Sequence, residues 1–147
     1  MKVIAGYILA VLVTYILGAA FVSQGNIAAV ISMGFEVTFS HRIEALLHDI
    51  THMYDLYLPL VAIGLMIALL VAAVIIRFVP NLRLIGYLSA GFVGMIALHV
   101  ILKAVLGLSG IAPTRELLGL VLQGVAGGCG GLVYHYLTLA RIPRTGS

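Results

Sequence analysis

The chain has 147 residues and is too apolar to form an ordinary water-soluble domain. Hydrophobic residues make up 63% of it and charged residues only 9%, against roughly 25% in soluble domains, and the mean hydropathy is +1.21. The net charge of +3 comes from basic residues dispersed along the chain, which excludes the basic patch of a nucleic-acid-binding protein. The single cysteine, Cys129, excludes an intramolecular disulfide and a multi-cysteine metal site.

Four apolar segments divide the chain, each of about 20 residues, the length with which a helix crosses a hydrocarbon core of ~30 Å. They cover residues 3–22, 56–76, 84–106 and 117–137. We therefore predict an all-α fold, an integral membrane bundle of four transmembrane helices that forms one domain over residues 1–147. We expect membrane lipid to surround this bundle and to be its main partner.

The first apolar segment also has features of a signal peptide cut after Ala20. It follows Lys2 and carries small residues near its end. Its apolar stretch is longer than the usual signal-peptide core of about 7–15 residues, which favours a retained span.

The distribution of charge between the connecting segments predicts the orientation. With the N-terminus inside, the inner side holds five basic and no acidic residues: Lys2, Arg77, Arg83, Arg141 and Arg144. All the acidic residues then lie outside: Glu36, Glu44, Asp49, Asp55 and Glu116. The positive-inside rule thus predicts two cytoplasmic termini, and we expect a protein of a bacterial inner membrane.

The outer segment, residues 23–55, contains the pattern of a strongly amphipathic helix facing outward. At about 100° per residue, five apolar side chains share one face and five polar ones lie opposite. The apolar set is Ile43, Leu46, Leu47, Ile50 and Tyr54, and the polar set is His41, Glu44, His48, His52 and Asp55. We expect Ser40 to cap this helix, Pro59 to bend it where it runs on into the second span, and residues 27–39 to form a short interfacial or re-entrant piece.

Two histidines of this polar face, His48 and His52, are spaced to share one divalent metal ion. Residues four apart lie on adjacent turns of a helix, and Glu44 or Asp55 can add an oxygen ligand. The surrounding sequence HDITH lacks the glutamate of the H-E-x-x-H proteases. Three interpretations stay open: a metal site, an entrance for an ion or protonatable substrate, and a solvated face of an interfacial helix.

A second group of polar residues lies inside or beside the spans. His99 and Lys103 are one turn apart in the third span, and Gln123 lies in the fourth. Burying such groups in a membrane is costly, so His99 should face the bundle interior, with Gln123 as a natural partner. Asp55 and Glu116 can pair with Lys103, which predicts one ligand-binding cluster of His99, Lys103, Gln123 and Asp55. The alternative is a neutral structural histidine bonded to a neighbouring helix.

The fourth span carries a glycine-rich face made of Gly124, Gly127, Gly128 and Gly131. Small residues four apart let helix backbones approach closely, so this face predicts a packing seam. Its partner is either a helix of the same chain or a second copy. His135, flanked by Tyr134 and Tyr136, fits an interfacial aromatic belt.

The sequence leaves two classes of function open. One is a small polytopic membrane protein whose outward His/carboxylate cluster binds a cation, a proton or a small polar ligand. The other is a non-catalytic scaffold or accessory subunit that docks a partner membrane protein. Phosphate loops and nucleophile elbows are absent, so an enzyme is the weaker expectation.

Overall fold

The computed structural model describes residues 2–106 and 117–139, and in these ranges the regular elements are all helical. The order along the chain is α1 (Lys2–Ser32), α2 (Phe39–His52), α3 (Tyr54–Ile76), the short 3-10 helix η1 (Pro80–Leu82), α4 (Arg83–Leu106) and α5 (Leu117–Thr138). Four helical segments are long and apolar enough to cross a membrane, which confirms the all-α class with four candidate spans.

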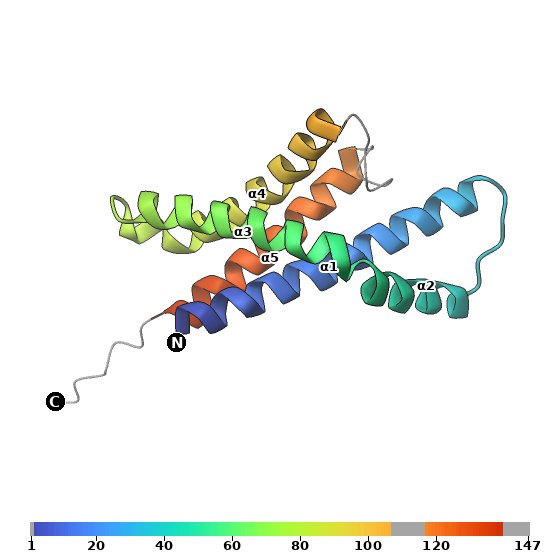
Figure 1. Ribbon diagram of the computed structural model, residues 1–147, viewed down its shortest axis with the longest axis horizontal. Helices are drawn as coiled ribbons and strands as arrows, with labels where there is room; N and C mark the ends of the chain where they lie inside the picture. Colours follow the sequence, from blue (N-terminus) through green and yellow to red (C-terminus); the bar gives the residue numbers. More distant parts are fainter. Residues whose placement is uncertain (1, 107–116, 140–147) are drawn as a thin grey trace.

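Helix α5 packs along both α1 and α4 (Figure 1). It runs antiparallel to α1, since Gly6 near the start of α1 lies beside Thr138 and Gly18 lies beside Gln123. α3 packs mainly on α4, to which the short turn around η1 joins it. The polar residues of the interior therefore come from helices that are distant in sequence.

Helices α4 and α5 meet backbone to backbone. Gly91 and Gly127 each face the other's carbonyl oxygen with no room for a Cβ, and Gly131 faces the carbonyl of Tyr87 in the same way. All four glycines of the predicted seam, Gly124, Gly127, Gly128 and Gly131, lie against α4. In this structure the seam therefore joins two helices of one chain.

Helix α1 is longer than the sequence suggested. The predicted span stopped at residue 22, whereas α1 continues to Ser32, so residues 27–32 extend this helix instead of forming a separate piece. No proline interrupts the stretch, and the helix ends just before Gly34, whose φ of 90° is the left-handed conformation that commonly terminates helices. At 1.5 Å per residue its 31 residues extend about 46 Å.

The connection between α2 and α3 also differs from the expectation of one helix bent at Pro59. The helix breaks at Met53, and Pro59 lies inside α3. Side chains in the last turn of α2 bond to its own carbonyl groups: the Thr51 hydroxyl donates to the carbonyl of Leu47 at 2.8 Å. Such bonds compete with the helical ladder and favour a break there.

The N-cap of α2 is Thr38, two residues before the predicted cap, Ser40. The Thr38 side chain accepts a bond from the backbone N–H of His41, whereas the Ser40 hydroxyl donates to the Glu44 carboxylate at 3.1 Å. Two contacts hold α2 against α1: Arg42 donates to Gln24 at 3.3 Å, and the Tyr15 hydroxyl donates to the carbonyl of Ile50 at 2.5 Å.

Candidate functional site

A buried polar cluster lies where α1, α3, α4 and α5 come together. The hydroxyl of Tyr57 on α3 donates to the side-chain oxygen of Gln123 on α5, at 2.5 Å. The amide nitrogen of Gln123 in turn donates to the carbonyl of Gly18 on α1, at 3.1 Å. Gln123 is only 1% exposed, so this chain of bonds satisfies its amide on both sides and ties three helices together.

His99 on α4 adds an imidazole to this cluster. Its ring lies edge-on to the ring of Tyr57, with 6.2 Å between the ring centroids, and the residue is 6% exposed. The Nδ1 atom lies 2.8 Å from the carbonyl oxygen of Met95 in the preceding turn. A carbonyl can only accept, so Nδ1 carries the proton, and in the neutral ring Nε2 then presents a lone pair.

The Nε2 atom of His99 is buried and has no hydrogen-bond partner among the described residues. A buried acceptor without a donor costs about 1–3 kcal/mol relative to a paired one, so such atoms are uncommon and call for an explanation. The hydroxyls of Thr14 and Ser23 on α1 are likewise buried and without a partner in the described chain. Among the described residues, two imidazoles share this state: His99 in this cluster and His135 at the opposite end of the bundle.

Tyr15 connects the cluster to the outer helix. Its ring centroid lies 5.8 Å from that of Tyr57, and its hydroxyl is bonded to Ile50 on α2. A continuous series of contacts therefore runs from α2 through Tyr15 and Tyr57 to Gln123. Sequence reasoning missed both tyrosines. Tyr15 lies well inside the first apolar segment, which is itself a signal because tyrosine in spans is concentrated at the interfaces. Tyr57 is the second residue of the second predicted span, where the same preference favours an interfacial position.

The four residues predicted as one ligand-binding cluster separate into two groups. His99 and Gln123 are buried and both contact Tyr57, whereas Lys103 and Asp55 are exposed. Each of these charged residues lies near the end of its helix, where the charge can stay solvated at no burial cost. Glu116, the other predicted partner of Lys103, lies outside the described residues.

The polar face of α2 is exposed and does not cover His99. The rings of His48 and His52 stack with centroids 4.0 Å apart, and His52 Nδ1 lies 2.8 Å from the carbonyl of His48. Glu44, the predicted third ligand, instead accepts the bond from Ser40. Within residues 2–106 and 117–139, no three His, Cys, Asp or Glu side chains are grouped so that they could hold a metal ion.

A second polar cluster lies at the opposite end of the bundle. Arg83, at the start of α4, donates to the carbonyl and the hydroxyl of Thr138 at the end of α5, at 3.1 and 2.8 Å. Its guanidinium lies 5.6 Å from the ring centroid of Tyr87, which packs edge-on against Tyr134. His135 is buried beside Tyr87, and its Nδ1 has no partner in the described chain.

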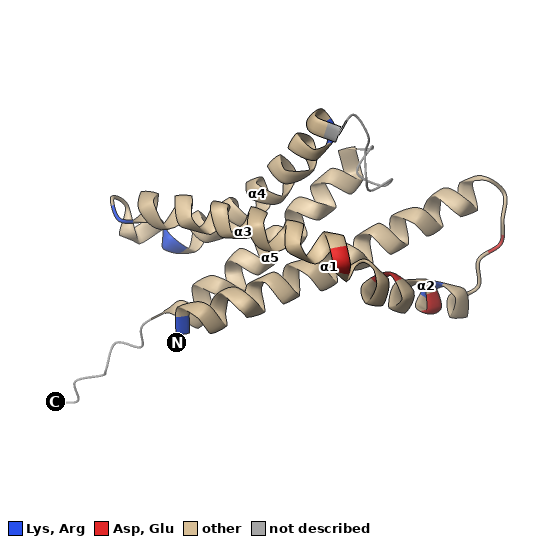
Figure 2. Cartoon of the chain, viewed as in Figure 1, with Lys and Arg blue, Asp and Glu red and all other residues tan. Residues whose placement is uncertain are grey.

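Charge is distributed unevenly between the two ends of the bundle. Figure 2 shows the positions of the acidic residues, in red, on α2, on the loop before it and at the start of α3. Lys2, Arg77 and Arg83 lie at the other end, where α1 and α4 begin and α3 ends.

No protein-family model, curated protein or solved structure matches this chain.

Proposed function

We propose that this is a small polytopic protein of a bacterial inner membrane that crosses the bilayer four times, with both termini in the cytoplasm. In this arrangement the cluster of His99, Tyr57 and Gln123 lies within the membrane and binds a proton or a small polar ligand that donates a hydrogen bond. The observation that carries this function is the buried, unpartnered Nε2 of His99. An ionisable side chain inside a membrane is a functional candidate by default, because placing it there is costly.

The cluster has the chemistry to receive such a ligand. Nδ1 is already fixed as a donor to Met95, so the basic Nε2 is the atom that remains available. The ring of Tyr57 lies next to the imidazole, and aromatic rings favour a neighbouring positive charge. The Tyr57 hydroxyl can both donate and accept, which lets it respond to a change in the protonation of the cluster.

The outer helix fits the same arrangement. As an amphipathic helix, α2 would lie at the outer surface, with Ile50 turned toward α1 and the exposed His41, Glu44, His48 and His52 toward water. The contact between Tyr15 and Ile50 then links the outer surface to the interior cluster. The acidic residues at this end and the basic residues at the other agree with the positive-inside rule.

Nitrogen NMR of protein labelled at histidine tests the binding function. Protonation converts Nε2 of His99 from an imine-type to an amine-type nitrogen, whereas a bound hydrogen-bond donor shifts its signal and leaves the nitrogen imine-type. We expect the conversion during titration with acid and the shift during titration with ammonium ions, and we expect His99→Gln to remove the signal. His41→Gln, on the exposed face of α2, is the matched control. A His99 Nε2 signal that kept both its type and its position under every condition in which the protein stays folded would make His99 a structural residue.

One observation favours the second function, an accessory subunit that docks a partner membrane protein or a second copy. The polar face of α2 points away from His99, and several large apolar side chains beside it, Phe35, Phe39 and Leu47, are exposed. A photoreactive amino acid at position 47 tests this alternative. Cross-links to another protein chain would support docking, whereas cross-links to lipid alone would contradict it.

A further inference from the structure

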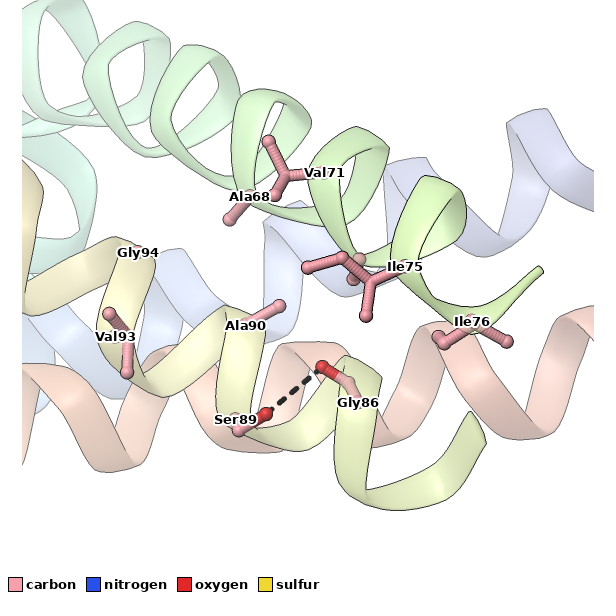
Figure 3. A pocket seen from close by; sticks show the side chains of 10 residues that line it. Ala68, Val71, Ile75, Ile76, Gly86, Ser89, Ala90, Val93 and Gly94 are labelled. Carbon is pink, nitrogen blue, oxygen red and sulfur yellow. Dashed lines mark hydrogen bonds between the residues drawn. The ribbon is translucent and has the colours of Figure 1, made fainter. Parts of the chain in front are cut away.

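An apolar groove of about 330 Å³ lies between α3 and α4 (Figure 3). It extends from Ala68 to Ile76 on α3 and from Gly86 to Gly94 on α4. The one hydroxyl in its lining belongs to Ser89, which donates to the carbonyl of Gly86 in its own helix at 3.2 Å. The groove therefore offers a surface of apolar side chains without an unsatisfied polar group.

The two helices touch at both ends of the groove and separate between them. A Cβ on Gly94 would lie 2.6 Å from the Cβ of Ala68, and one on Gly86 would lie 2.9 Å from the side chain of Ile76. Small residues between these contacts leave the hollow, while the exposed side chains of Val71, Ile75 and Val93 border it. The hollow thus opens toward the surroundings of the bundle.

The length of the groove is close to the thickness of one leaflet of a bilayer. From Gly86 to Gly94 the axis of α4 rises about 12 Å, at 1.5 Å per residue. Half of a hydrocarbon core is about 15 Å thick. Since Gly86 lies in the first turn of α4 and Ile76 is the last residue of α3, the groove starts at the end of the span and reaches toward its middle.

Two basic residues lie near the end of the bundle where the groove starts. Arg77 directly follows α3 and Arg83 begins α4, and the described acidic residues lie at the other end of the bundle. The bonds from Arg83 to Thr138 use the NH2 nitrogen of its guanidinium. The Nε and NH1 nitrogens of a guanidinium carry further N–H donors, each able to donate a charge-assisted bond to a phosphate oxygen.

From this juxtaposition we infer that the groove is a binding site for an anionic phospholipid. One acyl chain occupies the hollow between α3 and α4, and the phosphate contacts Arg83, with Arg77 adding to the positive potential. The inference rests on membrane insertion, as proposed above, and is independent of the cluster around His99.

Native mass spectrometry of the detergent-solubilised chain tests the site with phosphatidylglycerol and phosphatidylcholine of identical acyl chains. We expect phosphatidylglycerol to bind about tenfold more tightly, because both lipids carry the phosphate but Arg77 and Arg83 repel the choline cation of phosphatidylcholine. Val93→Trp fills the groove and should abolish this binding. Val100→Trp, also on an exposed position of α4 but outside the groove, should leave it unchanged. Equal affinity for the two lipids, or equal binding by the two tryptophan variants, would overturn the proposal.

Photolabelling of the unaltered chain gives an independent readout that does not depend on the folding of a variant. A phosphatidylglycerol with a diazirine in its acyl chain should label Ala90, Val93 and Val71. Labelling spread evenly over the exposed faces of α1, α3 and α5 would contradict a defined site. Recovery of the chain outside the membrane fraction would refute membrane insertion as well as the lipid site. Recovery in the membrane fraction without defined labelling would refute the lipid site alone.

Discussion

His99 differs from the other polar residues of the interior in that one of its nitrogens is bonded and the other, equally buried, is not. Its interior position could be predicted from the sequence, because an ionisable residue deep in a span must turn away from lipid. The position of Tyr57 between His99 and Gln123 could not be predicted from the sequence. Tyr57 and Gln123 are 66 residues apart in the chain, and no local pattern reports a contact over that separation.

The bond between Tyr57 and Gln123 should be measurable as a coupling energy. Gln123→Leu leaves the Tyr57 hydroxyl buried without its acceptor, while the Gly18 carbonyl keeps its partner within α1, so we expect the change to lower the free energy of unfolding by about 1–3 kcal/mol. Tyr57→Phe should cost less after this change than before it, because the hydroxyl has already lost its acceptor. Denaturant unfolding of the two single variants and the double variant in detergent gives the cycle. Strict additivity would show that the bond contributes nothing.

The stacked pair His48 and His52 offers two imidazoles on an exposed surface. We expect weak zinc binding that is lost in His48→Ala and in His52→Ala, because each change removes one of the two imidazole ligands. Both variants should keep their free energy of unfolding within about 0.5 kcal/mol, since the positions are exposed. Calorimetric titration measures the binding, with His41→Ala as the control. Undiminished heat in both alanine variants would place the zinc elsewhere.

At the scale of the helices, apolar windows predict that a span exists but say little about where its helix ends. The end of α1 depends on the left-handed Gly34, and the break at Met53 depends on side-chain bonds in the last turn of α2. Such ends are set by competition between local hydrogen bonds, which a hydropathy pattern does not contain. The glycine pattern of α5, in contrast, indicated a close backbone contact, and the structure adds that the contacting helix is α4.

Two neighbouring glycines of α5 should respond in opposite ways to alanine. The Cβ of Gly127→Ala would clash with the carbonyl of Gly91, so we expect lower thermal stability and a looser contact between α4 and α5. At Gly128 the added Cβ would meet the carbonyl of Leu88 at 3.6 Å, an ordinary contact, and alanine favours a helix by about 1 kcal/mol over glycine. Gly128→Ala should therefore be neutral or stabilising. Equal effects of both changes in thermal denaturation would contradict the packing described for this pair.

At the scale of the whole molecule, the account joins four apolar helices, an uneven distribution of charge and a polar interior. The number of candidate spans could be predicted from the sequence because length and apolarity are local properties. The packing of the helices around Tyr57 and Gln123 could not be predicted from the sequence, because it depends on the close packing of α5 against both α1 and α4. The proposed function requires that this assembly lie in a membrane with α3 crossing it once.

The most direct measurement compares two cysteines on either side of α3, introduced into a Cys129→Ser background. Glu36→Cys lies in the loop before α2 and Asn81→Cys in the turn after α3, and both positions are exposed. A membrane-impermeant thiol reagent applied to intact spheroplasts should label position 36 at once and position 81 only after permeabilisation. Labelling of both positions from the same side would contradict the four-span topology. The proposal that His99 acts inside the membrane would then be wrong as well.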